Sequence, residues 1–277
     1  MSEDMFRHDD YDTLLTVAKR RRSVRKFEPG REVSREILQQ IMEIGRWAPS
    51  GANTQPWEFI CVHDPAQRLA VREVFLKQAE RLRTKAARFP AVRKEYMANT
   101  VAIIVVLGDP RWKASFPQGH PDVPQYIPEY DQNNEQILLA SMGAAIQMLH
   151  LGVASFGLTS AWLSGGGEAT TNKELSELLG YPEHLVAYGT IPIGYPAKDV
   201  SFRYRRPLSQ LVHWNQYEST QYRSQELIDF YNNSLRPFAM YRNDENASDW
   251  PDVDDKLGQW KEAFTGRVTN ASGKLEE

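Results

Sequence analysis

The stretch "NEQILLASMGAAIQMLHL" at 134–151 restricts the possible folds more than any other part of the chain. At helical spacing it is apolar on nearly every side, so the helix that it predicts must be buried in a core or in a subunit interface. Gly157 is expected to stop this helix. A chain of 277 residues with 41% hydrophobic residues can form a core of sufficient size.

Hydrophobic periodicity predicts the other elements. Helices are expected at 11–21, 34–48, 65–83 and 171–180, and strands at 57–63, 101–109, 158–164 and 185–197. Ser34 and Asp64 are the expected N-caps of two helices, and Gly180 is expected to end a third. This order, followed by a polar tail, predicts a single α+β domain with appendages.

Two segments are candidates for lids over a site. The segment 110–130 carries five prolines and is expected to be an irregular loop, and long loops in compact domains are often functional. The segment 75–97 is the second candidate. The predicted division of the chain is a main domain at 1–212 and a C-terminal extension at 213–277, which packs on that domain or on a partner subunit.

Charge and composition exclude several classes of function. A net charge of −3 argues against a nucleic-acid binder, which usually needs broad positive charge. The longest apolar run, "VAIIVVL" at 101–107, is too short to span a membrane. The single cysteine, Cys61, cannot form an intrachain disulfide, and the N-terminal residues lack a signal-peptide pattern. The protein is therefore expected to be cytoplasmic, without nucleic-acid or membrane partners.

The sequence has no standard catalytic or metal motif. Neither G-x-G-x-x-G nor the P-loop pattern occurs, and no G-x-S-x-G elbow is present. The six histidines show neither H-x-x-H nor H-E-x-x-H spacing, so no metal site is predicted, although scattered ligands could converge in space.

The run "KRRRSVRKF" at 19–27 is a dense basic cluster in a slightly acidic protein. Guanidinium groups bind phosphate bidentately, and a hydroxyl group between them adds a hydrogen bond. On extended backbone Arg21, Ser23 and Arg25 would share one face. The run fits an anion pocket, but taken alone it favours a solvated helix end whose cations complement the helix dipole.

The stretch "APSGANTQPWEF" at 48–59 joins a predicted helix to a predicted strand. Its glycine allows the backbone to approach a ligand closely, and its prolines present flat apolar faces to a ring. A simple connector has the same composition, so the stretch alone decides nothing.

Together, "RRSVRKF" and "RWAPSGANTQPWEF" resemble two motifs of the nitroreductase-like family of FMN-dependent oxidoreductases, in that family's order and near its usual separation. The later "GLTSAWLSGG", "IPIGYPAKD" and "RRPLSQLV" look like its third and fourth elements. The resemblance implies a nitroreductase-like sandwich, with a central mixed or antiparallel sheet and surrounding helices. It also implies that 1–212 is an FMN-binding domain in an obligate homodimer, with flavin sites at the interface.

The family motifs, carried over position by position, imply a set of FMN-binding residues. These are Arg21, Arg22, Ser23, Arg25, Pro49, Ser50, Gly51, Asn53, Ser164, Gly165, Arg205 and Arg206. The resemblance places Arg21 to Ser23 on phosphate and ribityl, with Arg25 nearer the ring, and Pro49 to Gly51 on the ring from the partner subunit. Asn53 would steady that loop, Ser164 and Gly165 would lie beside the flavin N5 edge, and Arg205 or Arg206 would return to the phosphate.

The chemistry implied is that of an NAD(P)H oxidoreductase. NAD(P)H would reduce FMN and leave, and a nitroaromatic, quinone or similar electron-poor acceptor would then take the electrons in a ping-pong cycle. Because the flavin is the reactive group, no catalytic side chain is expected. Alternatives are a same-fold reductive dehalogenase, a heterocycle oxidase or a flavin-cleaving enzyme. A non-enzymatic flavin or nucleic-acid binder is a further alternative.

Overall fold

The computed structural model describes residues 8–85, 94–115, 128–198, 208, 211–219 and 224–230. The chain divides into two compact units, residues 1–200 and residues 201–277, and the predicted boundary after residue 212 stays a prediction. The described part of the second unit includes one short helix, α6 (Gln225–Phe230). The first unit contains α1 (His8–Arg20), α2 (Arg35–Arg46), α3 (Pro65–Lys85), α4 (Pro128–Ser155) and α5 (Ala169–Leu179).

The sheet of the first unit has four strands in the order β1-β2-β4-β3, and each neighbouring pair is antiparallel. β2 (Ala102–Gly108) lies between β1 (Trp57–Val62) and β4 (Val186–Gly194), and β3 (Thr159–Ser160) pairs with β4 at the edge. The predicted α+β class and the predicted antiparallel sheet are confirmed.

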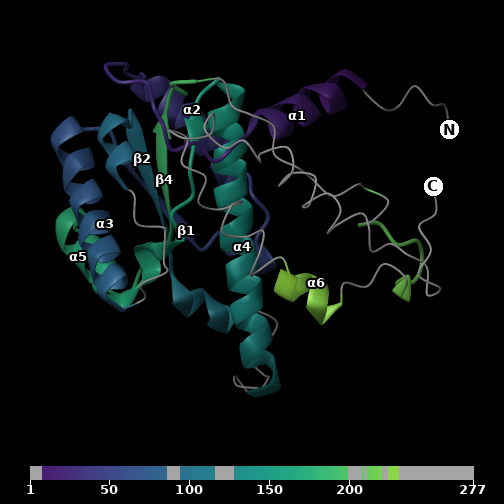
Figure 1. Ribbon diagram of the computed structural model, residues 1–277. Helices are drawn as coiled ribbons and strands as arrows, with labels where there is room; N and C mark the ends of the chain where they lie inside the picture. Colours follow the sequence, from purple (N-terminus) through teal and green to yellow (C-terminus); the bar gives the residue numbers. More distant parts are fainter. Residues whose placement is uncertain are drawn as a thin grey trace. The chain divides into compact units, whose positions relative to one another are not determined.

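Helices cover both faces of the sheet, as Figure 1 shows, with α3 and α5 on one side of the strands and α2 and α4 on the other. Successive residues of β2 point to opposite faces. Ile104 and Val106 therefore join a core with α2 and α4, whereas Ile103 and Val105 join a second core with α3 and α5. Burial on both faces explains why β2 reads as an uninterrupted apolar run.

α4 contains the predicted apolar helix and is longer than predicted at both ends. Proline is favourable in the first turn, so the helix begins at Pro128, and Gly157, with φ of +70°, lies just past its end. By length and composition α4 could cross a membrane, but over half of its most apolar window is buried in the protein, as in a core helix. Its other side is partly exposed, and Leu139 keeps 46% of its accessible surface.

Two predicted elements differ from the structure. The strand expected at 158–164 is reduced to β3, because Pro192 of β4 accepts a hydrogen bond from Ala161 N but has no N–H to return one. The loop expected at 110–130 begins as a short 3-10 helix, η4 (Pro110–Ser115), and its last residues belong to α4. Residues 116–127 lie outside the described part of the chain.

Substituting Gly45→Ala is expected to lower the free energy of unfolding by about 1–3 kcal/mol, the usual result of overpacking a core. A Cβ atom at Gly45 of α2 would lie 2.5 Å from Cδ2 of Leu149, which is fully buried on α4. Gly143→Ala on α4 is the control, since nothing lies within 4 Å of that Cβ position. Urea unfolding should separate the two variants, and equal midpoints would contradict the prediction.

Candidate functional site

The basic segment after α1 runs beside the sheet edge formed by β3. Val24 N donates to Ser160 O over 3.0 Å, and Ser23 forms a parallel bridge with Ser160. Ser23 and Arg25 are exposed on either side of the buried Val24. The predicted alternation of side chains is confirmed at these positions, and the basic groups are presented at one edge of the sheet.

A buried lysine lies next to this segment. Lys94 is only 8% exposed, and its burial, together with the charge of Arg25, lowers its pKa to about 8. Within the described residues, neither Lys94 nor Arg25 forms an ion pair with a carboxylate. Two neighbouring cations that pair with no described carboxylate, one of them buried, favour an anionic or electron-rich ligand.

Tyr96 adds a polar atom to the same place. Its hydroxyl is buried and makes no hydrogen bond of good geometry, although the Arg25 guanidinium lies near it. Burial raises the pKa of Tyr96 to about 12, and the charge of Arg25 partly opposes that rise. An unsatisfied buried hydroxyl is costly, so a ligand that bonds to it would remove that cost.

His150 lies behind the basic segment and carries no charge near neutral pH. Its Nδ1 is 2.7 Å from the Ser160 hydroxyl, and the side chain is buried on α4. Burial, assisted by the charge of Arg21, lowers the pKa of His150 to about 4. The imidazole therefore supports Ser160 without adding a further positive charge beside Arg21.

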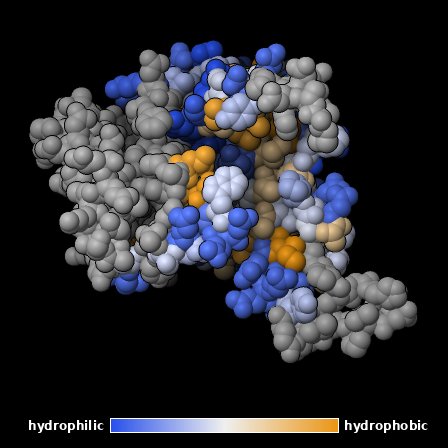
Figure 2. Space-filling model, turned by 90° about the vertical axis from the view of Figure 1, so that its right-hand side faces the viewer, coloured by the Kyte–Doolittle hydropathy of each residue, from blue (hydrophilic) through white to orange (hydrophobic). Residues whose placement is uncertain are grey.

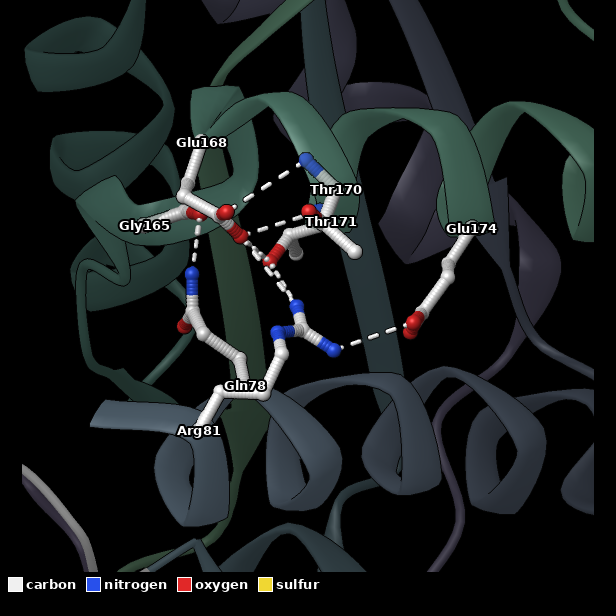
Figure 3. A network of polar contacts seen from close by, with 7 residues as sticks. All are labelled: Gln78, Arg81, Gly165, Glu168, Thr170, Thr171 and Glu174. Atoms are coloured by element: carbon white, nitrogen blue, oxygen red, sulfur yellow. Dashed lines mark hydrogen bonds and ion pairs between the residues drawn. The ribbon is translucent and has the colours of Figure 1, made fainter. Parts of the chain in front are cut away.

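A glycine-rich turn, η5 (Ser164–Gly167), follows β3 and leads into α5 (Figure 3). Ser164 is exposed and Gly165 is partly buried. The carbonyl of Gly165 accepts a 2.6 Å hydrogen bond from Nε2 of Gln78 on α3. Burial acts to raise the pKa of Glu168, but hydrogen bonds from Thr171 and Arg81 lower it to about 2.

The loop after α2 has an unusual backbone. Ala52, Asn53 and Gln55 have φ values of 50°, 53° and 46°, in the left-handed region that non-glycine residues rarely adopt. Ser50 Oγ accepts from Gln55 N, and Gly51 N donates to Ser141 Oγ of α4 over 3.1 Å. Strained conformations held by their surroundings cluster at functional sites, which favours a ligand contact over a simple connector.

The structure brings together only part of the predicted set. The segment from Arg21 to Arg25 meets Ser160, and the turn with Ser164 and Gly165 follows four residues later. The loop with Pro49, Ser50, Gly51 and Asn53 is held on α4 instead, so its contact with a partner's site stays a prediction. Arg205 and Arg206 lie outside the described residues.

Sequence reasoning missed Lys94, His150 and Gln78. Lys94 lies within the basic stretch "AERLRTKAARFPAVRKEY" at 79–96, which fits a solvated face as well as a binding site. No local pattern marks Lys94 as buried, because the 3-10 helix η3 (Glu95–Asn99) separates it from β2. Groups of three or more metal-ligating side chains are absent from the described part of the chain.

We expect His150 to make the protein less stable in acid. The unfolded chain binds this proton near pH 6.5 and the folded chain only near pH 4, so stability is complete above about pH 6.5 and falls toward pH 4. The loss at the acid end is about 3 kcal/mol. His150→Gln, a neutral amide that can still bond to Ser160, should remove this part of the dependence. Urea unfolding at about pH 7.5 and about pH 4.5 tests this, and an unchanged slope would contradict it.

Solved structures share this fold. An iodotyrosine deiodinase bound to FMN and 3-iodo-L-tyrosine superposes with a TM-score of 0.55 at 21% identity, covering 74% of this chain and 100% of that one. At this identity the likeness establishes the α+β fold.

Sequence relatives give the family. An Archaeoglobus fulgidus protein, provisionally named NADH dehydrogenase/NAD(P)H nitroreductase, is 30% identical over 191 residues, which are 69% of this chain and 90% of that protein. A Nematostella vectensis iodotyrosine deiodinase is 27% identical over 209 residues, 70% of this chain and 72% of its own. The model of the nitroreductase family matches residues 18–195. With that match covering more than half of its length, the chain belongs to the nitroreductase family.

Proposed function

We propose that this protein is an FMN-dependent NAD(P)H oxidoreductase that reduces nitroaromatic, quinone or similar electron-poor acceptors. The observation that carries the proposal is the buried Lys94 beside Arg25, with no described carboxylate paired to either cation. Reduced flavin is an anion, and positive charge near its pyrimidine edge stabilises it. The names of the relatives support an oxidoreductase that uses a nicotinamide donor.

The residues present fit FMN. Arg21, Arg22 and Ser23 supply guanidinium and hydroxyl donors for a phosphate, and Arg205 or Arg206 are proposed to add to them. Arg25 and Lys94 supply the positive charge for the pyrimidine edge. When bound, FMN would accept hydride from NAD(P)H and then pass the electrons to the second substrate, in a ping-pong cycle.

The side chains themselves bind and orient. His150 is neutral and hydrogen-bonded, and Lys94 keeps most of its charge at neutral pH. No nucleophile or general base is required, because the cofactor carries the electrons. We therefore propose no catalytic side chain in this protein.

A homodimer fits the surface of the described residues. Figure 2 shows apolar residues, in orange and tan, gathered in the hollowed middle of one face between hydrophilic borders. The large exposed apolar side chains include Leu14 of α1, Leu139 of α4, and Trp47 at the end of α2. Contiguous exposed apolar surface marks an interface, and a second copy of the chain is proposed to cover this face. The protein is proposed to act in the cytoplasm.

A reductive dehalogenase is the second candidate. The relative from Nematostella vectensis is named an iodotyrosine deiodinase, and a deiodinase structure shares the fold. Both candidates use the same cofactor site and differ in the second substrate. Offering the reduced protein an iodinated phenol and a nitrobenzene separately distinguishes them, since iodide release would favour the dehalogenase.

We expect purified protein to bind FMN and to lose its flavin absorbance under anaerobic conditions when NADPH or NADH is added. Adding an acceptor should restore the absorbance, because the cofactor is reoxidised. A protein that takes up no FMN would refute the proposed function. A bound flavin that neither nucleotide reduces would indicate a binding protein or another reductant.

Substituting Lys94→Met is expected to weaken FMN binding roughly 10-fold to 100-fold, the usual cost of a lost charge-assisted hydrogen bond. Methionine keeps the apolar stem but removes the buried charge. Lys77→Met is the control, because Lys77 is an exposed lysine on α3 and the substitution is the same. Fluorescence titration of the apoprotein with FMN measures both affinities. Equal affinities would contradict the role given to Lys94.

A further inference from the structure

The turn η5 (Ser164–Gly167) is held by a polar network that the proposed function does not use (Figure 3). Its anchor residues, Gln78 and Arg81, lie one helical turn apart on α3 and face the start of α5. Gln78 is only 4% exposed, so its amide lies in the protein interior.

The Gln78 amide acts on a single peptide group. Its Nε2 donates to the carbonyl of Gly165 over 2.6 Å, and Glu168 N donates to the same carbonyl over 3.2 Å. Glycine has the widest choice of backbone conformations, and residues 165–167 are all glycine. Two donors on one carbonyl therefore fix an orientation that the turn would not hold by itself.

The fit between Gln78 and Gly165 leaves no space for a side chain. A Cβ atom at position 165 would lie 2.7 Å from both Nε2 and Oε1 of Gln78. On the opposite side, a Cβ at Gly166 would lie 3.1 Å from the backbone oxygen of Ala187 in β4. The turn is thus confined between a helix and a strand.

Arg81 holds the far end of the same turn. Its guanidinium bonds to Glu168 over 3.2 Å, to Glu174 over 3.0 Å and to Thr171 Oγ1 over 3.0 Å. Glu168 in turn caps α5 by accepting from the backbone N–H groups of Thr170 and Thr171. Two residues of one helix, α3, therefore anchor the turn: Gln78 at Gly165 and Arg81 at Glu168.

We propose that Gln78 is a positioning residue for the redox centre: by fixing the Gly165 carbonyl, it sets the peptide groups of residues 164–166 that face the flavin N5 edge. This inference rests on the proposed function. Preorganised backbone donors lose their effect when they are displaced by about 1 Å. Gln78 touches neither cofactor nor substrate, so its effect passes through the turn.

The test compares Gln78→Met with Ser176→Ala in FMN-loaded protein. Methionine has nearly the shape of glutamine but no donor. Ser176 Oγ also makes a buried 2.6 Å hydrogen bond to a carbonyl, that of Tyr181, at the other end of α5. Removing that bond costs comparable stability without touching the turn.

We expect Gln78→Met to shift the midpoint potential of the bound FMN and to slow its anaerobic reduction by saturating NAD(P)H about 10-fold to 100-fold. FMN affinity should change less than about threefold, because the phosphate and pyrimidine contacts lie elsewhere. Ser176→Ala should leave both potential and reduction rate at wild-type values. Wild-type values in Gln78→Met, or equal changes in both variants, would overturn the proposal.

Gln78→Glu supplies a rescue that a purely structural role would not show. A protonated carboxyl can donate to the Gly165 carbonyl, whereas an ionised one cannot. Among the described residues, the charged groups of this network are Arg81, Glu168 and Glu174, and both glutamates pair with Arg81. Relative to wild type at each pH, the reduction rate and the potential should recover as pH falls. A ratio that is independent of pH would count against the proposal. Failure of the wild-type protein to bind FMN would instead refute the proposed function itself, and this inference with it.

Discussion

The architecture depends on the complete burial of β2. This strand pairs with β1 on one edge and with β4 on the other, and its side chains alternate between two cores. Because β2 is paired on both edges and buried on both faces, α2 and α4 pack on one side and α3 and α5 on the other. β4 pairs with β3 at the edge of the sheet, and there Ser160 O accepts a hydrogen bond from Val24 N of the basic segment. The candidate site therefore lies where a rigid sheet ends and irregular backbone begins.

Electrostatics at that edge are arranged around an excess of positive charge. Arg25 and the buried Lys94 lie together, and no carboxylate among the described residues pairs with either of them. His150 is neutral and Tyr96 keeps its proton. Burying an uncompensated cation is unfavourable for folding alone. A bound anionic or electron-rich group, as proposed for this site, would offset that cost. His150 is uncharged chiefly because it is buried, and the charge of Arg21 lowers its pKa further.

Much of the fold could be predicted from local patterns. Ser34 and Asp64 cap their helices as predicted, and Gly180 ends α5 with φ of +73°. The strand predicted at 158–164 is confirmed only at β3 and at an isolated bridge between Leu163 and Thr190. Between them its pairing meets Pro192, which is remote in sequence and lacks an N–H. The basic segment could be predicted from composition and family resemblance. Lys94 and Gln78 could not, because neither polar residue carries a local sign of burial, and their roles come from tertiary packing.

Gln78 and the glycine turn show how the fold divides its tasks. The residues nearest the proposed chemistry, 164–167, are small and have little conformational preference of their own, which allows close approach to a planar ring. Such a turn has no intrinsic rigidity, so its geometry must come from elements that are rigid for other reasons. α3 is one of these, since Val71 and Phe75 bury one side of it in the core while Gln78 and Arg81 extend to the turn. Through the Gln78 hydrogen bond, the packing of α3 fixes the backbone of the turn, and this is how a buried amide of a core helix would influence the proposed redox chemistry.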